Sequence, residues 1–256
     1  GQEIGLKRFE PASFLCGLLD SQPMGFYAPA QLIQDARRHG VVVRGPDVTA
    51  SDGECTLEAC GDDAPSTPLP GIVPAPAVRL GLHRVRGLAR EAAARIVAAR
   101  RQQTFDSVDD LAARARLDAA TLRRLAAAGA LATLAGHRRQ ALWQAAAIRS
   151  HDDVLAGAPV HETQAELAAP SETENLLADY ARLGFTLGRH PLALLRARLQ
   201  GERFVPAAEI MDCADRQIAR AAGLVTCRQR PSTAKGTMFI TLEDETGLVN
   251  VVVHAE

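Results

Sequence analysis

The chain of 256 residues contains several short stretches in which apolar residues recur at helical spacing. Pro29 stands where a first helical turn tolerates proline, and Gly40 supplies a C-terminal cap for that helix. Further amphipathic helices are predicted to begin near residues 90, 107, 118, 136, 171 and 191. Helices this short are marginal alone, so we expect them to bury their apolar faces against one another.

The pattern changes after Val205, where three β-rich runs are separated by turns. The runs cover 224–228, 237–242 and 248–253, and their spacing predicts a three-stranded antiparallel meander. The fold class expected from these patterns is mainly α with a small β domain. Shorter strands are expected at 41–43 and near 55–57.

Two stretches rich in acidic residues and proline, 51–77 and 150–171, are predicted to be loops or connectors. No apolar run approaches the ~18 residues of a membrane helix, so no membrane partner is expected. The five cysteines form no C-x-x-C pair, and we expect a reducing, cytoplasmic location without structural disulfides. The seven histidines show no metal-ligand spacing, and no Gly-rich phosphate loop is present, so no cofactor is expected in this chain.

The formal net charge of −1 conceals an uneven distribution. Residues 79–149 carry fourteen arginines against five acidic residues, whereas 151–180 carry seven acidic residues and no Lys or Arg. Basic modules separated by acidic connectors are typical of a protein that binds a polyanion at several points. Solvated faces of ordinary arginine-rich helices would give the same counts, and charge alone leaves both interpretations open.

The most informative motif is a glycine turn that precedes the helix near residue 90. Gly87 can turn the chain tightly with positive φ, and the first N–H groups of the next helix then point at an anion such as phosphate. The turn and its flanking residues are candidate DNA contacts: Arg84, Arg86, Gly87, Leu88, Ala89 and Arg90. Nothing in the motif could read base edges, so binding is expected to be independent of sequence.

These residues resemble the helix-hairpin-helix motif, which binds the DNA backbone. Ala89 stands where such hairpins usually have a second glycine. A helix-capping glycine turn in an ordinary helical bundle is the alternative interpretation. A weaker hairpin-like unit at 128–131 is expected to be a packing partner.

The meander looks like the first half of an OB-fold, a barrel that binds single strands with basic and aromatic side chains. Phe239 could stack on a base or belong to the core, and both interpretations stay open. The expected single-strand contacts in this part are Arg228, Arg230, Lys235 and Phe239. Three of the five strands of a barrel are present, so the OB-fold is expected to be truncated.

The order of several segments resembles the C-terminal part of bacterial C-family DNA polymerases, the polymerase III alpha subunits. The segments are Ser21–Tyr27, Asp35–Val41, the hairpin, Ala128–Leu131, Leu183–Phe185 with His190–Leu192, and Phe239–Asn250. Residues 21–27 are most similar to the error-prone branch. The resemblance implies the end of the fingers domain at 1–78, tandem helix-hairpin-helix at 79–149, a linker at 150–202 and the OB-fold from 203 to 256.

The resemblance implies DNA-directed DNA polymerase activity, a nucleotidyl transfer that depends on Mg²⁺ held by palm aspartates. Those aspartates are expected upstream of this chain, so the segment alone is predicted to be inactive. Acidic pairs such as Asp109–Asp110, Asp152–Asp153 and Glu243–Glu245 are interpreted as a helix start, a linker and a turn.

The leading hypothesis is a sequence-independent grip on template-primer DNA within an error-prone polymerase of translesion synthesis and DNA repair. Duplex backbone would bind at the hairpin, and the template single strand at the OB-fold. The alternative is a protein-interaction module that docks the sliding clamp or accessory mutagenesis proteins. The salt dependence of DNA binding separates the two hypotheses.

Overall fold

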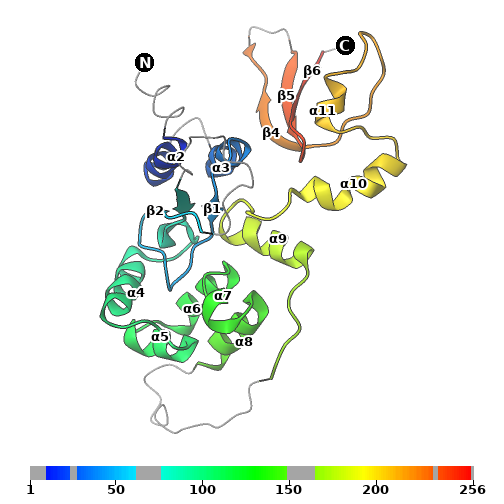
Figure 1. Ribbon diagram of the computed structural model, residues 1–256. Helices are drawn as coiled ribbons and strands as arrows, with labels where there is room; N and C mark the ends of the chain where they lie inside the picture. Colours follow the sequence, from blue (N-terminus) through cyan, green and yellow to red (C-terminus); the bar gives the residue numbers. More distant parts are fainter. Residues whose placement is uncertain (1–9, 24–27, 62–75, 149–164, 233–235, 255–256) are drawn as a thin grey trace. The chain divides into compact units, whose positions relative to one another are not determined.

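A computed structural model describes residues 10–23, 28–61, 76–148, 165–232 and 236–254 (Figure 1). The chain divides into two compact units, one ending at Leu187 and the other beginning at Gly188. Each unit is described by itself below. The module boundaries predicted at 78, 149 and 202 stay predictions.

The first unit begins with two helices and a small sheet. These elements are α2 (Pro11–Asp20), α3 (Pro29–Arg38), β1 (Val43–Arg44), β2 (Thr56–Glu58) and β3 (Ala77–Arg79). The strand order is β1-β3-β2, with β3 parallel to β1 and antiparallel to β2. Glu58 of β2 accepts hydrogen bonds from Arg79 and Arg44, and the bond from Arg79 is the main reason that the pKa of Glu58 is lowered. The predicted loop 51–77 contains β2, which confirms the strand expected near 55–57, and it leads into β3, which was not expected.

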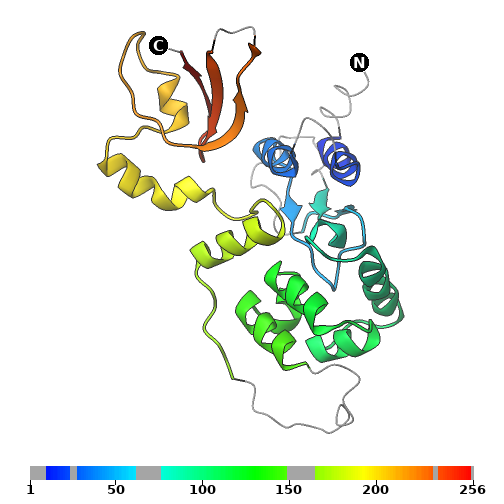
Figure 2. The ribbon, with the colours of Figure 1, turned by 180° about the vertical axis from the view of Figure 1, so that it is seen from behind.

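Five helices and one 3₁₀ turn follow: η1 (Leu82–Arg84), α4 (Arg90–Gln102), α5 (Val108–Arg114), α6 (Ala119–Ala127), α7 (Ala132–Ala135) and α8 (Arg138–Ala147). Side chains cap three of them, Ser107 for α5, Asp118 for α6 and His137 for α8. Figures 1 and 2 show α2 and α3 on one side of the small sheet and these helices on the other. The helices pack on one another as expected, around a core that includes Ile96, Leu111, Leu122, Leu125 and Leu131.

Two apolar residues of these helices lie outside the core. Ala94 is exposed, because Ala92 and Ala93 occupy the inner face of α4 instead. Trp143 of α8 is 54% exposed and takes little part in the core. Alanine-rich helices give a weak apolar stripe, so their facing depends on the larger residues of neighbouring helices.

The last helix of the first unit is α9 (Glu172–Arg182), which begins near residue 171 as predicted. Ser171 and Glu174 form a capping box at its N-terminus. Residues 165–168, predicted to belong to a connector, lie against α8. Gln140 donates to the carbonyl oxygen of Ala165 and accepts from the N–H of Leu167. Most of that predicted connector, up to residue 164, lies outside the described residues.

The second unit contains α10 (Pro191–Gly201), α11 (Ala207–Ile210), β4 (Leu224–Gln229), β5 (Met238–Glu243) and β6 (Leu248–Val253). The strands form the predicted antiparallel meander in the order β4-β5-β6, with a register shift between Val225 and Cys227. Arg196 of α10 pairs with Asp244 and Glu245 in the turn after β5. The structure is thus mainly α with small β sheets, and an OB-fold stays a prediction.

Candidate nucleic-acid interface

The glycine turn at residues 85–89 is held in place by buried apolar side chains, and its backbone is exposed to solvent. Gly87 has φ +76°, a conformation that favours glycine because it has no Cβ. Val85 is buried in the core shared by the sheet and α2, and Leu88 packs against both cores of the first unit. Gly87, Ala89 and Arg90 are exposed. An oxyanion in solvent can therefore reach the backbone of the turn.

No side chain caps the N-terminus of α4, and among the described helices of this region α7 shares that feature. The N-cap residue of α4 is Ala89, which has no acceptor, whereas Ser107, Asp118 and His137 cap α5, α6 and α8. Among the described residues, the N–H groups of Gly87, Ala89, Arg90 and Glu91 have no acceptor. Unpaired N–H groups and the positive end of the helix dipole together favour a bound anion.

The three arginines predicted at the turn have different surroundings. Arg90 is exposed in the first turn of α4, and Arg84 is half-buried. Neither guanidinium forms a hydrogen bond or ion pair with another described residue. Arg86, in contrast, donates its backbone N–H to the carbonyl oxygen of Arg182 at 2.9 Å. Its guanidinium reaches the carbonyl oxygen of Tyr180 at 3.5 Å, so Arg86 is tied to the C-terminal end of α9.

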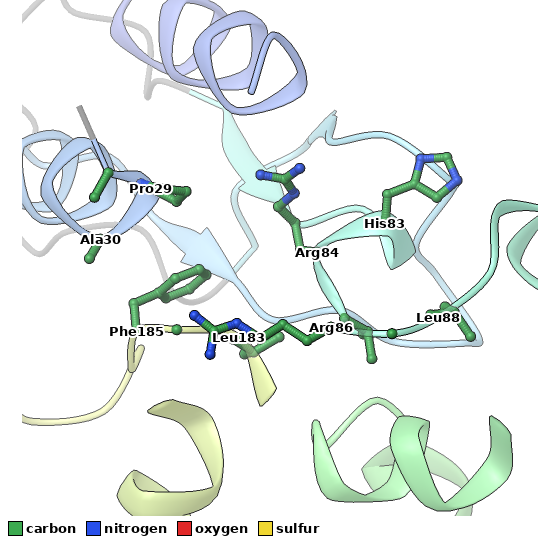
Figure 3. Close-up of a pocket in the computed structure, with 12 residues that line it drawn as sticks. Pro29, Ala30, His83, Arg84, Arg86, Leu88, Leu183 and Phe185 are labelled. Carbon is green, nitrogen blue, oxygen red and sulfur yellow. The ribbon is translucent and has the colours of Figure 1, made fainter. Parts of the chain in front are cut away.

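A pocket of about 380 Å³ adjoins the turn (Figure 3). Its walls come from the start of α3, the hairpin, and the segment 183–185. Figure 3 shows the Arg86 side chain running along the hairpin toward Leu183 and Phe185. The twelve lining residues include Arg84 and Arg86 and no carboxylate, so the pocket carries positive charge.

Sequence reasoning missed Arg124 of α6, which lies beside the turn. A Cβ placed on Gly87 would lie 3.5 Å from Arg124 Nε and 3.6 Å from its Cδ. Thirty-seven positions separate the two residues in the chain, and no local signal in the sequence connects them. The arginine comes to the turn because α6 packs beside the hairpin in the helical core.

The expected single-strand contacts of the meander do not all share one surface. Phe239 is 42% exposed and pairs across the sheet with Gln229 and Val252, which therefore share its face. Arg228 pairs with Ile240, on the opposite face, because neighbouring residues of a strand alternate. The structure therefore does not bring Arg228 and Phe239 together.

The remaining two residues expected in that group follow β4. Arg230 is exposed just after the end of the strand. Lys235 lies outside the described residues. The aromatic side chain alone is therefore placed on the exposed face that the stacking hypothesis requires.

The described acidic pairs noted in the sequence lie at a helix start and in a turn. Asp109 and Asp110 lie in the first turn of α5, as predicted. Asp244 accepts hydrogen bonds from Thr246, Ala207 and Gly247 in the turn after β5. Burial raises the pKa of Asp244, but these hydrogen bonds outweigh burial, and the pKa is lowered overall. Asp152 and Asp153 lie outside the described residues. The described part of the chain contains no cluster of three or more His, Cys, Asp or Glu placed to hold a metal ion.

Cys55 lies in a setting that does not suit a metal ligand. Burial is the main cause that raises the pKa of the Cys55 thiol to about 12, which disfavours the thiolate that a metal needs.

None of the helices in the described ranges has the length and apolar character needed to span a bilayer.

Comparison with known proteins bears on this interface. Residues 40–141 match the model of a family described as "Helix-hairpin-helix motif". The chain is 70% identical over 251 residues to an error-prone DNA polymerase of Aromatoleum aromaticum. The aligned residues make up 98% of the chain and 23% of that protein. Polymerases of the same description from Azoarcus sp. and Burkholderia pseudomallei are 58% and 55% identical, again over 98% of the chain and 23% of each protein. Over 98% of its length the chain is therefore similar to a segment of error-prone DNA polymerases.

The resemblance to the error-prone polymerases is therefore confirmed. The chain spans about a quarter of the length of the relatives it matches. The helix-hairpin-helix match includes the Gly87 turn, α4 and α6, so the matched region and the open turn coincide.

Proposed function

We propose that this segment binds template-primer DNA through its sugar-phosphate backbone, without sequence preference, on behalf of an error-prone DNA polymerase. The observation that carries the proposal is the exposed, uncapped start of α4 behind Gly87, inside the region that matches the helix-hairpin-helix family. A helix start of this kind binds one phosphate group with backbone N–H donors.

Positive side chains around the turn support the same function. Arg84 and Arg90 lie on either side of Gly87, and neither is paired with another described residue. Guanidinium groups form strong, charge-assisted hydrogen bonds to phosphate. Backbone N–H groups and guanidinium groups at phosphates fix the position of the duplex but carry no information on its sequence.

For the second unit we propose contact with the template single strand, within an OB-like barrel. Phe239 supports this proposal because its ring is exposed on the sheet. An exposed ring can stack on any base, which gives affinity without sequence preference.

We propose that the parent protein is a DNA polymerase of translesion synthesis, in which Mg²⁺-dependent nucleotidyl transfer takes place outside this segment. The described residues fit no Mg²⁺ site, because no three His, Cys, Asp or Glu residues among them are grouped to hold a metal ion, and Asp244 and Glu245 both pair with Arg196. Expression of the 256 residues alone should give DNA binding without primer extension. Robust extension by the purified segment would contradict this placement of the active site.

The DNA-binding proposal is tested by the affinity for duplexes of unrelated sequence at several salt concentrations. Substitution of Arg90 by Ala should weaken binding to all sequences alike and reduce the slope of log K against log salt by about 0.9, the value for one phosphate contact. Arg101→Ala is the matched control, since Arg101 is an exposed arginine at the other end of α4. Equal slopes for the two variants, or affinity that depends on sequence, would contradict the proposal.

A second candidate function is docking of a protein partner, such as a sliding clamp or an accessory mutagenesis protein. It is favoured by four exposed apolar residues that share one face of the meander: Leu224, Phe239, Leu248 and Val252. Apolar patches of this kind often mark protein interfaces. DNA binding that does not respond to salt would favour this candidate.

A further inference from the structure

The first unit contains two glycine turns of similar conformation in the helix-hairpin-helix region. Gly87 has φ +76° and Gly129 has φ +80°. Each precedes a helical segment, α4 in the first case and α7 in the second. Conformation alone therefore does not distinguish them as candidate phosphate sites.

The Gly129 turn is closed by the protein itself. The N–H groups of Ala128, Gly129 and Ala130 donate to the carbonyl oxygens of Arg124, Ala126 and Leu125, so none of the three is available to a ligand. The helix that follows, α7, has four residues and therefore only a small dipole.

The Arg138 side chain also covers this second turn. A Cβ placed on Gly129 would lie 3.1 Å from the NH2 group of Arg138. Arg138 is held there by α9, because its guanidinium pairs with Asp179 and donates to the carbonyl oxygen of Asn175 at 2.8 Å. At the second turn the Asp179 carboxylate thus takes the place beside Arg138 that a phosphate would need.

At the Gly87 turn the N–H groups of Arg86 and Leu88 are bonded too, to the carbonyl oxygens of Arg182 and Val85, but the N–H of Gly87 itself has no acceptor among the described residues. The N–H groups from Ala89 to Glu91 have no acceptor among the described residues, and they begin a helix of thirteen residues. The side chain of the arginine beside this turn, Arg124, makes no hydrogen bond or ion pair with a described residue. Its guanidinium is therefore available to an anion bound at Gly87.

We propose that a single DNA phosphodiester binds at a composite site, made of the N–H groups that follow Gly87 and the guanidinium of Arg124 from the second hairpin. The second turn makes no phosphate contact, because Arg138 and Asp179 occupy it. This inference rests on the proposed function and adds to it the identity of the cation and the number of turns that bind.

Binding of the full 256-residue chain to a short duplex, measured across a salt series, tests the role of Arg124. Arg124→Ala should weaken binding about tenfold and reduce the salt slope by about 0.9. Arg123→Ala removes the same charge from the neighbouring exposed position of α6 and should change the slope much less. Arg124→Lys should restore most of the slope, since it keeps the charge. Equal slopes for Arg123→Ala and Arg124→Ala would overturn the inference.

A second measurement tests which turn binds, without any substitution. Backbone amide signals of the chain are followed by NMR as the same duplex is added at low salt. The signals of Gly87, Ala89 and Arg90 should shift, and those of Gly129 and Ala130 should stay in place. Comparable shifts at both turns would overturn the inference. Wild-type protein that does not bind DNA at any salt concentration would instead contradict the proposed function itself.

Discussion

The backbone N–H of Arg86 donates to the carbonyl oxygen of Arg182 at 2.9 Å, which joins the Gly87 hairpin to the end of α9. The Arg86 side chain continues the connection, because its guanidinium lies across Gly184 and reaches the carbonyl oxygen of Tyr180. Gly184 itself has φ +90°. Arg86, a residue expected to contact DNA, therefore also positions the turn. The effect of Arg86→Ala on DNA binding would not separate these two roles.

Gly184→Ala tests this connection. The new Cβ would lie 2.6 Å from the NH2 group of Arg86, and φ +90° is unfavourable for alanine, so we expect a loss of about 2 kcal/mol in unfolding free energy. Urea denaturation measures the loss. Adding Arg86→Ala should relieve the steric part and leave the backbone strain.

Gly17→Ala is the control, because Gly17 lies within α2 and a Cβ there would meet nothing within 4 Å. That variant should be as stable as the wild type or slightly more stable. A Gly184→Ala variant with wild-type stability would contradict the role assigned to this contact.

Helices could be predicted from the sequence because their signals are local. Ser107, Asp118 and Ser171 lie where side-chain caps were expected, and the helices after them begin accordingly. The strand β3 and the helix α7 were missed. Three residues of β3 gain their conformation from pairing with β1 and β2, and a single turn such as α7 has no periodicity to detect.

The site could be predicted only in part, since the roles of arginines depend on tertiary structure. Arg95, Arg100 and Arg114 donate to backbone carbonyl groups of distant segments, so much of the positive charge in residues 79–149 holds the fold together. A guanidinium has five donors in a planar arrangement, which suits it equally to carbonyl oxygens and to phosphates. The Gly87 turn was visible in the sequence, but the position of Arg124 was not.

The ion pair between Arg138 and Asp179 should be important for the stability of the first unit. Both side chains are largely buried, with 12% and 16% exposed. Asp179→Ala would leave a buried guanidinium without its carboxylate, and we expect a loss of about 3 kcal/mol in unfolding free energy. Thermal or urea denaturation measures this loss.

Arg139 provides the comparison for that variant. It pairs with Glu174 at 2.7 Å, but the two side chains are 39% and 54% exposed. Exposed ion pairs contribute little, so Arg139→Ala should cost less than about 1 kcal/mol. Similar losses for Asp179→Ala and Arg139→Ala would show that burial is not what makes the Arg138 pair important.

The acidic turn of the second unit predicts a loss of stability in acid. The hydrogen bond from Arg196 is the main cause that lowers the pKa of Glu245 below its ordinary value of 4.5. A carboxyl group with a lowered pKa in the folded state stabilises the fold above its unfolded-state pKa. This contribution should be complete above about pH 5 and should disappear as the pH falls through the folded-state pKa.

Arg196→Met tests the origin of that pH dependence. The variant should be less stable at pH 7, and its stability should change less between pH 5 and pH 3 than that of the wild type. Arg198→Met is the control, because Arg198 is 80% exposed and pairs only with exposed Glu202 among the described residues. Urea denaturation at each pH gives the comparison. The same acid response in wild type and Arg196→Met would contradict the assignment.

Phe239 separates the two functions considered for the meander. Loss of a stacked ring costs about 1–3 kcal/mol per base, so Phe239→Ala should weaken binding of single-stranded DNA about 5- to 150-fold and leave duplex binding unchanged. Leu248→Ala is the matched control, since Leu248 lies on the same face and is similarly exposed, at 47% against 42%. Leucine cannot stack on a base in this way, so Leu248→Ala should bind single strands as the wild type does. If both variants bind single strands normally but lose binding to a protein partner, the face is a docking surface and the stacking hypothesis is wrong.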